Sequence, residues 1–97
     1  MSNRQKINIT AAQIYTRSQQ VIRVPNCAGF MFTNTGDNTV RVNGMVVFPG
    51  TVGSILGDSR TISMQSGEEY VGNIDVSFTL PVTALQALEI VQMFYVD

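Results

Sequence analysis

Residues 39–48 of the chain read TVRVNGMVVF, and this stretch decides the fold. Two runs of apolar and β-branched residues flank the pair Asn43-Gly44. Such a pair readily adopts the two positive φ angles that a tight type I′ hairpin turn requires. Pro49-Gly50 follows the second run, and these residues are typical of a type II turn. The stretch therefore predicts a β-hairpin.

Further short strands are predicted on both sides of this hairpin, because apolar or alternating runs there are bounded by turn residues. They lie at residues 6–11, 21–24, 28–33, 60–64, 70–80 and 87–96. Residues 6–11 and 70–80 alternate polar and apolar side chains, as strands with one buried face do. With the two arms of the hairpin they make about eight strands. We expect a single all-β domain over residues 1–97, an antiparallel β-sandwich with jelly-roll or immunoglobulin-like connectivity.

The last predicted strand is apolar on both faces. One face carries Leu88, Ile90, Phe94 and Val96, and the other carries Val91, Met93 and Tyr95. Such a strand is normally central and covered on both sides. In a small sandwich its outer face is covered by a loop or by another subunit. Val91 and Met93 are therefore candidate assembly contacts.

A second candidate contact lies in the glycine-rich segment 51–58, which reads TVGSILGD. It predicts a loop that carries two large apolar side chains, Ile55 and Leu56. These side chains either fold back over the core or dock on a partner, and the sequence leaves both alternatives open.

The composition excludes several classes of protein. Hydrophobic residues make up 44% of the 97 residues and charged residues 13%, with a net charge of -1. This balance is too apolar for disorder and lacks the basic patch of a nucleic-acid binder. No apolar run approaches the ~18 residues of a membrane span, and the first residues do not resemble a signal peptide. The sparse charge indicates surfaces that face neighbours or a surface rich in uncharged polar residues.

The sequence also offers little for catalysis. It has no histidine, the commonest general base and metal ligand, and Cys27 is its one cysteine. A lone cysteine forms no internal disulfide and no zinc site, so we expect a buried thiol. Glu68 and Glu69 are adjacent, and in a strand they would point to opposite faces. We therefore expect no enzyme, no cofactor, no metal and no small-molecule substrate.

Three segments resemble small virion-associated β-sandwich proteins of tailed bacteriophages. Residues 32–44 read FTNTGDNTVRVNG, residues 47–51 read VFPGT, and residues 88–96 read LEIVQMFYV, which is similar to the last strand of those proteins. These segments make up 27 of the 97 residues and include no catalytic motif.

The resemblance implies a capsid-associated, decoration, head-fibre or neck subunit that acts by self-assembly. Such a subunit is made in the host cytoplasm and resides in the virion. Its partners would be the other structural proteins of the particle and further copies of itself, so we expect a homo-oligomer that binds neither nucleic acid nor membrane.

The alternative is a carbohydrate-binding or adhesin-like β-sandwich module. Such modules usually present a planar aromatic platform, and this chain has three tyrosines and no tryptophan. The strand pattern predicts that Tyr70 and Tyr95 face the core. Tyr15 is then the main free aromatic ring.

Overall fold

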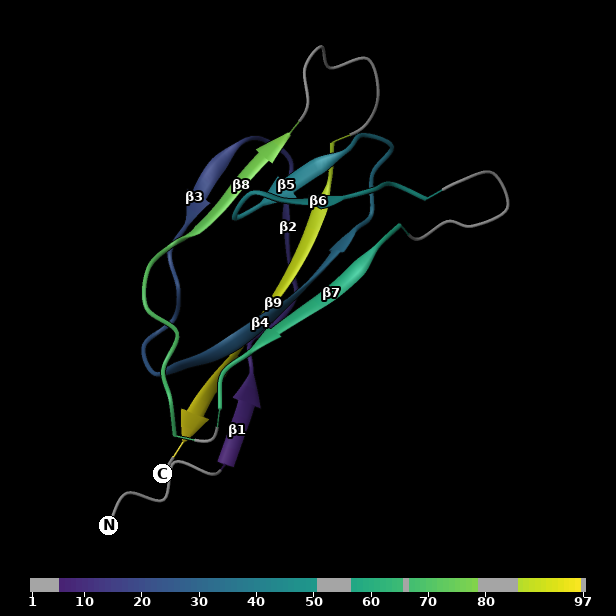
Figure 1. Cartoon of the computed structure of the whole chain (residues 1–97). Coiled ribbons are helices and arrows are strands. Elements are labelled where there is room, and N and C mark those ends of the chain that lie inside the picture. The colour runs from purple at the N-terminus through teal and green to yellow at the C-terminus, as the bar shows by residue number, and fades with distance from the viewer. Residues whose placement is uncertain (1–5, 51–56, 66, 79–85, 97) are drawn as a thin grey trace.

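The computed structural model describes residues 6–50, 57–65, 67–78 and 86–96 (Figure 1). These residues form nine strands and no helix. The strands are β1 (Lys6–Ile9), β2 (Gln13–Tyr15), β3 (Gln19–Val21), β4 (Cys27–Asn34), β5 (Val40–Val42), β6 (Met45–Val47), β7 (Ser59–Ser63), β8 (Ile74–Phe78) and β9 (Leu88–Val96).

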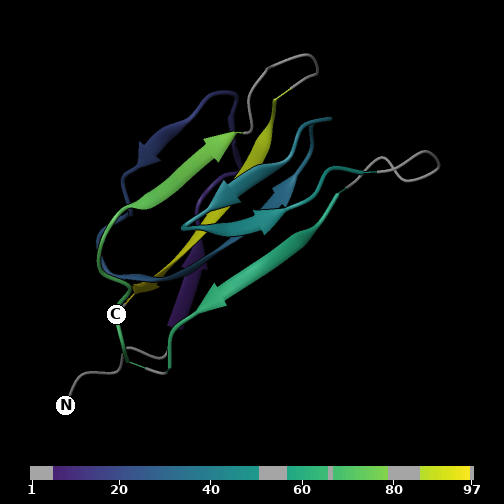
Figure 2. The same ribbon diagram turned by 45° about the horizontal axis from the view of Figure 1, so that its top comes forward.

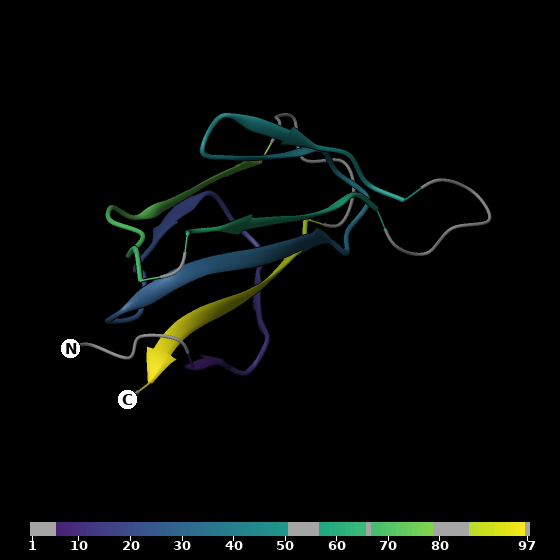
Figure 3. The same cartoon turned by 60° about the horizontal axis from the view of Figure 1, so that its bottom comes forward.

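The strands form two antiparallel sheets that pack face to face. The larger sheet has the order β1-β9-β4-β7, and β2 also pairs with β9. The smaller sheet has the order β3-β8-β5-β6. Figures 2 and 3 show the two layers, with β9 and β4 in one and the β5–β6 hairpin in the other. The prediction of an antiparallel β-sandwich is confirmed.

The strand order is that of a jelly roll. Strands β1 and β2 together occupy one edge position, so the nine strands fill eight positions. The first position then pairs with the last (β1 and β2 with β9), and β3 pairs with β8, β4 with β7, and β5 with β6. This nesting of antiparallel pairs around the central hairpin defines a jelly roll. Of the two connectivities that the sequence left open, it selects this one.

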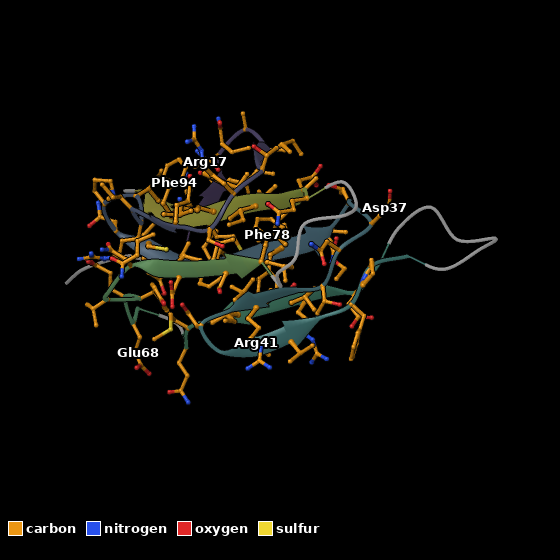
Figure 4. The ribbon with its side chains drawn as sticks, turned by 90° about the horizontal axis from the view of Figure 1, so that it is seen from above. Arg17, Asp37, Arg41, Glu68, Phe78 and Phe94 are labelled. Carbon is orange, nitrogen blue, oxygen red and sulfur yellow. The ribbon has the colours of Figure 1, made fainter. Side chains whose placement is uncertain are left out.

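The core lies between the sheets. The larger sheet contributes Phe30, Phe32, Leu88 and Ile90, and the smaller sheet contributes mainly valines, with Ile74 and Phe78. Figure 4 shows Phe78 between the layers, whereas Arg41 and Glu68 point to the periphery. The alternation of buried and exposed residues along β8 matches the predicted pattern, and β9 is central in its sheet, also as predicted.

The hairpin is formed as its sequence predicts. Asn43 and Gly44 have φ angles of 52° and 82°, as a type I′ turn requires. The Asn43 side chain also accepts a hydrogen bond from the Asp75 amide at 2.8 Å, which ties the turn to β8. The Asn-Gly pair therefore fixes the hairpin and anchors it to the sheet.

Three expectations about the N-terminal third were wrong. The strand expected at residues 21–24 lies earlier, at Gln19–Val21, and the short strand Gln13–Tyr15 was not expected at all. The first strand was expected to be half-buried, yet all four residues of Lys6–Ile9 are exposed. It forms an edge whose apolar side chains point away from the core, and alternation alone does not distinguish an inner face from an outer one.

Candidate functional site

The outer face of the larger sheet follows from the packing of its two central strands. Phe30 and Phe32 of β4 and Ile90 of β9 are buried in the core. Because side chains alternate along a strand, Met31, Val91 and Met93 must point to the opposite face. The register agrees, since Met31 stands directly opposite Val91. All three are half-buried, and none of the described elements covers them.

A β-bulge extends this apolar surface along the edge. Ile9 pairs with Met93 and Gln13 with Ile90, so three residues of the edge (10–12) stand opposite two of β9 (91–92). The extra residue reverses the alternation, and Ile14 therefore lies on the same face as Ile9. Without the bulge, an odd-numbered and an even-numbered residue of one strand would lie on opposite faces.

Six residues make up the surface that we call the apolar face: Ile7, Ile9, Ile14, Met31, Val91 and Met93. The isoleucines are 50%, 60% and 52% exposed, an unusual exposure for three large aliphatic side chains on one sheet face. Hydroxyl-bearing residues border the face on β4 and β7, where the hydroxyls of Thr33 and Ser59 are hydrogen-bonded at 2.8 Å. Among the strand residues that register and alternation place on this side, Glu89 is the one charged side chain.

The outer face of the smaller sheet has a different character. Register and alternation place Gln20, Arg41, Asp75 and Ser77 there, and all four are exposed. This surface is polar and carries both signs of charge, as expected of a face in contact with water. The two outer faces of one sandwich therefore differ, and the larger sheet presents apolar groups where the smaller presents charges.

Gln92 holds the edge and a neighbouring segment in place. Its amide oxygen accepts a hydrogen bond from the Val24 amide at 2.7 Å, and its amide nitrogen donates to the Ile22 carbonyl at 3.2 Å. Its backbone exchanges two bonds with the bulge: the Thr10 amide donates to the Gln92 carbonyl, and the Gln92 amide donates to the Thr10 hydroxyl. Through Thr10, β9 therefore fixes the bulge that sets the apolar face.

The candidate contacts named from the sequence have different outcomes. The structure places Val91 and Met93 together at the centre of the apolar face. Ile55 and Leu56 lie outside the described residues. Sequence reasoning missed the three isoleucines of the edge, because Ile7 and Ile9 were assigned to a half-buried strand. The available signal was an apolar first strand together with a last strand apolar on both faces.

A separate hollow of about 470 Å³ lies near the carboxyl end of β9. It is lined by Thr10, Val24, Pro25, Asn26, Phe94 and Tyr95. This volume could hold a small ligand. The lining is mainly apolar and includes no carboxylate or amine, and the Tyr95 hydroxyl donates to the Glu68 carbonyl at 2.6 Å. The hollow could hold an apolar group, but it lacks a paired acid and base.

The remaining reactive group is sequestered. Cys27 is fully buried, its thiol donates to the Gly29 carbonyl at 3.3 Å, and burial raises the pKa of the thiol. At neutral pH the sulfur is therefore protonated and weakly nucleophilic. Among the described residues, no three His, Cys, Asp or Glu side chains lie close enough together to hold a metal ion.

The tyrosines do not form an exposed aromatic platform. Tyr70 packs edge-on against Phe30 with ring centroids 5.3 Å apart and faces the core as predicted. Tyr95 was expected to face the core as well, but alternation places it on the side of Val91 and Met93, where it is buried and donates its hydroxyl to the Glu68 carbonyl. Tyr15 was expected to be free, but it is partly buried against the core. The correction follows from the bulge, which turns Tyr15 inward opposite Leu88.

Comparison with protein-family models, with curated proteins and with solved structures found no match to this chain. Within the part of the chain that the structure describes, no helix is long and apolar enough to span a membrane.

Proposed function

We propose that this chain is a non-catalytic structural subunit of a phage-like particle, as a capsid-associated, decoration, head-fibre or neck protein. The observation that carries the proposal is the apolar face, because three exposed isoleucines beside Val91 and Met93 are costly in water and are buried when a partner docks. A subunit of this kind needs a rigid scaffold and a docking surface, and no catalytic group.

The strand order supports the proposal. Jelly rolls recur in viral capsid proteins, although they also occur in lectins, so the fold alone does not decide the function. A glycan-binding role would need an exposed aromatic platform. All three tyrosines are buried or partly buried, and Phe48 is the exposed large aromatic side chain among the described residues. The apolar face therefore favours docking to protein over binding to sugar.

The proposal places the protein in the virion after synthesis in the host cytoplasm. Mass spectrometry of particles purified from the virus or prophage that encodes the sequence tests this directly. The chain should be a stoichiometric component, at a constant ratio to the major particle protein through successive gradient purifications. Loss of the chain during purification, or its presence only in trace amounts, would contradict the proposal.

A further inference from the structure

The charges around the apolar face limit the classes of partner that can bind it. Nucleic acids and anionic membranes require clustered lysine or arginine, and none of the strand residues that register and alternation place on this face is cationic. A charged protein partner would leave its own charges facing apolar side chains. The face therefore suits a partner surface that is itself apolar at its centre and uncharged over most of its area.

A second copy of the chain supplies such a surface. Resting on the proposed structural function, we infer that two copies pack their apolar faces together around a two-fold axis that crosses the strands. Homo-oligomers are most often two-fold dimers in which the same patch serves both partners. Sheets that pack face to face keep their strands within about 30° of each other, so rows of side chains on one sheet can face rows on the other.

The register shows three cross-strand rows on this side of the sheet. The first row carries Ile14, Glu89, Thr33 and Ser59. The second carries Val91, Met31 and Thr61, with the bulge at its edge. The third carries Ile9, Met93, Gly29 and Ser63. In the next row Tyr95 is already buried, with its hydroxyl bonded to the Glu68 carbonyl, and Ile7 beside it on the edge strand is the last exposed member of the face.

A two-fold axis through the second row makes these rows complementary. The first row of one copy then faces the third row of the other. Ile14 meets Ile9, and Thr33 meets Gly29, where no side chain is in the way. Glu89 faces Met93, and the two Glu89 carboxylates stand about four residues apart along the strand, or roughly 13 Å. An axis parallel to the strands and running along β9 would instead bring the two carboxylates face to face, which is unfavourable.

The size of the face suits a weak, reversible dimer. Four strand positions at about 4.8 Å spacing and the seven residues of β9 from Glu89 to Tyr95 at about 3.3 Å rise give roughly 450 Å² per copy. Two copies bury roughly 900 Å², which is in the range of weak or transient interfaces. The apolar half would form the centre and the hydroxyl-bearing half the rim, the usual anatomy of such interfaces.

Sedimentation equilibrium of the full chain tests the dimer, with the variants Ile9→Asp and Ile22→Asp as a matched pair. Both residues are exposed isoleucines, but Ile22 lies outside the apolar face. The natural chain should dimerise reversibly. Ile9→Asp should raise the dissociation constant roughly a hundredfold, because each dimer contains the residue twice, whereas Ile22→Asp should change it less than about threefold. Far-UV circular dichroism checks that each variant is folded, and Ile14→Asp replaces Ile9→Asp if it is not.

A second pair of variants tests the axis. If Glu89 faces Met93 of the other copy, Met93→Lys places a cation opposite each carboxylate and Met93→Glu places a second anion there. The lysine variant should then dimerise at least about tenfold more tightly than the glutamate variant. Equal dissociation constants would overturn the crossing axis.

The other outcomes separate the dimer from the structural function. A chain that stays monomeric at every concentration overturns the dimer, while its presence in purified particles would still support the structural role. An oligomer that Ile9→Asp leaves unchanged overturns this face as its interface. A dimer whose face is confirmed in a chain absent from the particles upholds the inference and contradicts the structural role.

Discussion

The side chain of Gln92 makes the packing of the larger sheet testable by one substitution, Gln92→Leu. Leucine has a similar size and keeps the strand apolar, but it removes the acceptor of the Val24 amide and the donor to the Ile22 carbonyl. Gln92 is 7% exposed, so at least the Val24 amide would lose its partner in a largely dry environment. A buried group left without its partner costs about 1 to 1.5 kcal/mol, and the two together about 2 kcal/mol.

Urea unfolding followed by far-UV circular dichroism measures this loss. The protein concentration must be low enough that self-association adds nothing to the stability. In a domain of this size, a loss of about 2 kcal/mol corresponds to a fall of about 10 °C in Tm. The matched control is Gln13→Leu, because Gln13 stands beside Ile90 in the same sheet but is exposed. The control should stay within about 0.5 kcal/mol of the natural chain.

A loss below about 0.5 kcal/mol for Gln92→Leu would refute the reasoning. It would mean that water replaces both hydrogen bonds and that segment 22–24 is held by other contacts. An equal loss in Gln92→Leu and Gln13→Leu would also refute it, since the effect would then follow from placing leucine in this sheet.

Three further substitutions probe the frame of the sandwich. Gly29→Ala should lower the free energy of unfolding in urea by about 3 kcal/mol, because Gly29 has a φ of 138° and an added Cβ would collide with the Ile62 carbonyl. A stability near that of the natural chain would contradict the close approach of β4 and β7. Asn34→Ala should lower the free energy of unfolding by about 3 kcal/mol, because the buried side-chain amide bonds the Asn38 and Val47 carbonyls and the Gly36 amide. A loss under 1 kcal/mol would contradict this account of Asn34. Cys27 should resist a thiol reagent until the chain unfolds, and rapid labelling of the folded chain would show that the sulfur is accessible. Because burial raises the pKa of the Cys27 thiol, the contribution of this thiol to the free energy of unfolding should be complete below pH 9.0 and should be lost as the pH rises through the folded-state pKa. The Cys27→Ala variant should lack this component of the decline.

Local chemistry made part of this fold predictable. The Asn43-Gly44 pair specifies its turn through two φ angles, and neither angle depends on the rest of the chain. The central position of β9 could also be predicted, because a strand that is apolar on both faces has no place at an edge in water. Both signals lie within ten residues of sequence, which is the range over which periodicity is informative.

The rest depends on contacts between distant residues. The bulge at residues 10–12 is defined by its register against β9, and it decides whether Ile14 or Tyr15 faces outward. Gln92 is polar, yet it is buried because it bonds two amides, a carbonyl and a hydroxyl from two other segments, Thr10 and residues 22–24. The alternation of apolar residues predicts neither the bulge nor the burial of Gln92, and so the edge isoleucines were assigned to the wrong side. The jelly-roll order is non-local for the same reason.

The most direct measurement of the central claim is oxidation footprinting of the methionines across a concentration series. Dilute hydrogen peroxide oxidises exposed methionines, and mass spectrometry reads each position separately. Met31 and Met93 lie on the apolar face, whereas Met45 packs against the core. If the apolar face closes against a second copy, oxidation of Met31 and Met93 slows as the concentration rises, and that of Met45 does not. Oxidation rates that stay constant at Met31 and Met93, from dilute monomer to the highest concentration, would contradict the account.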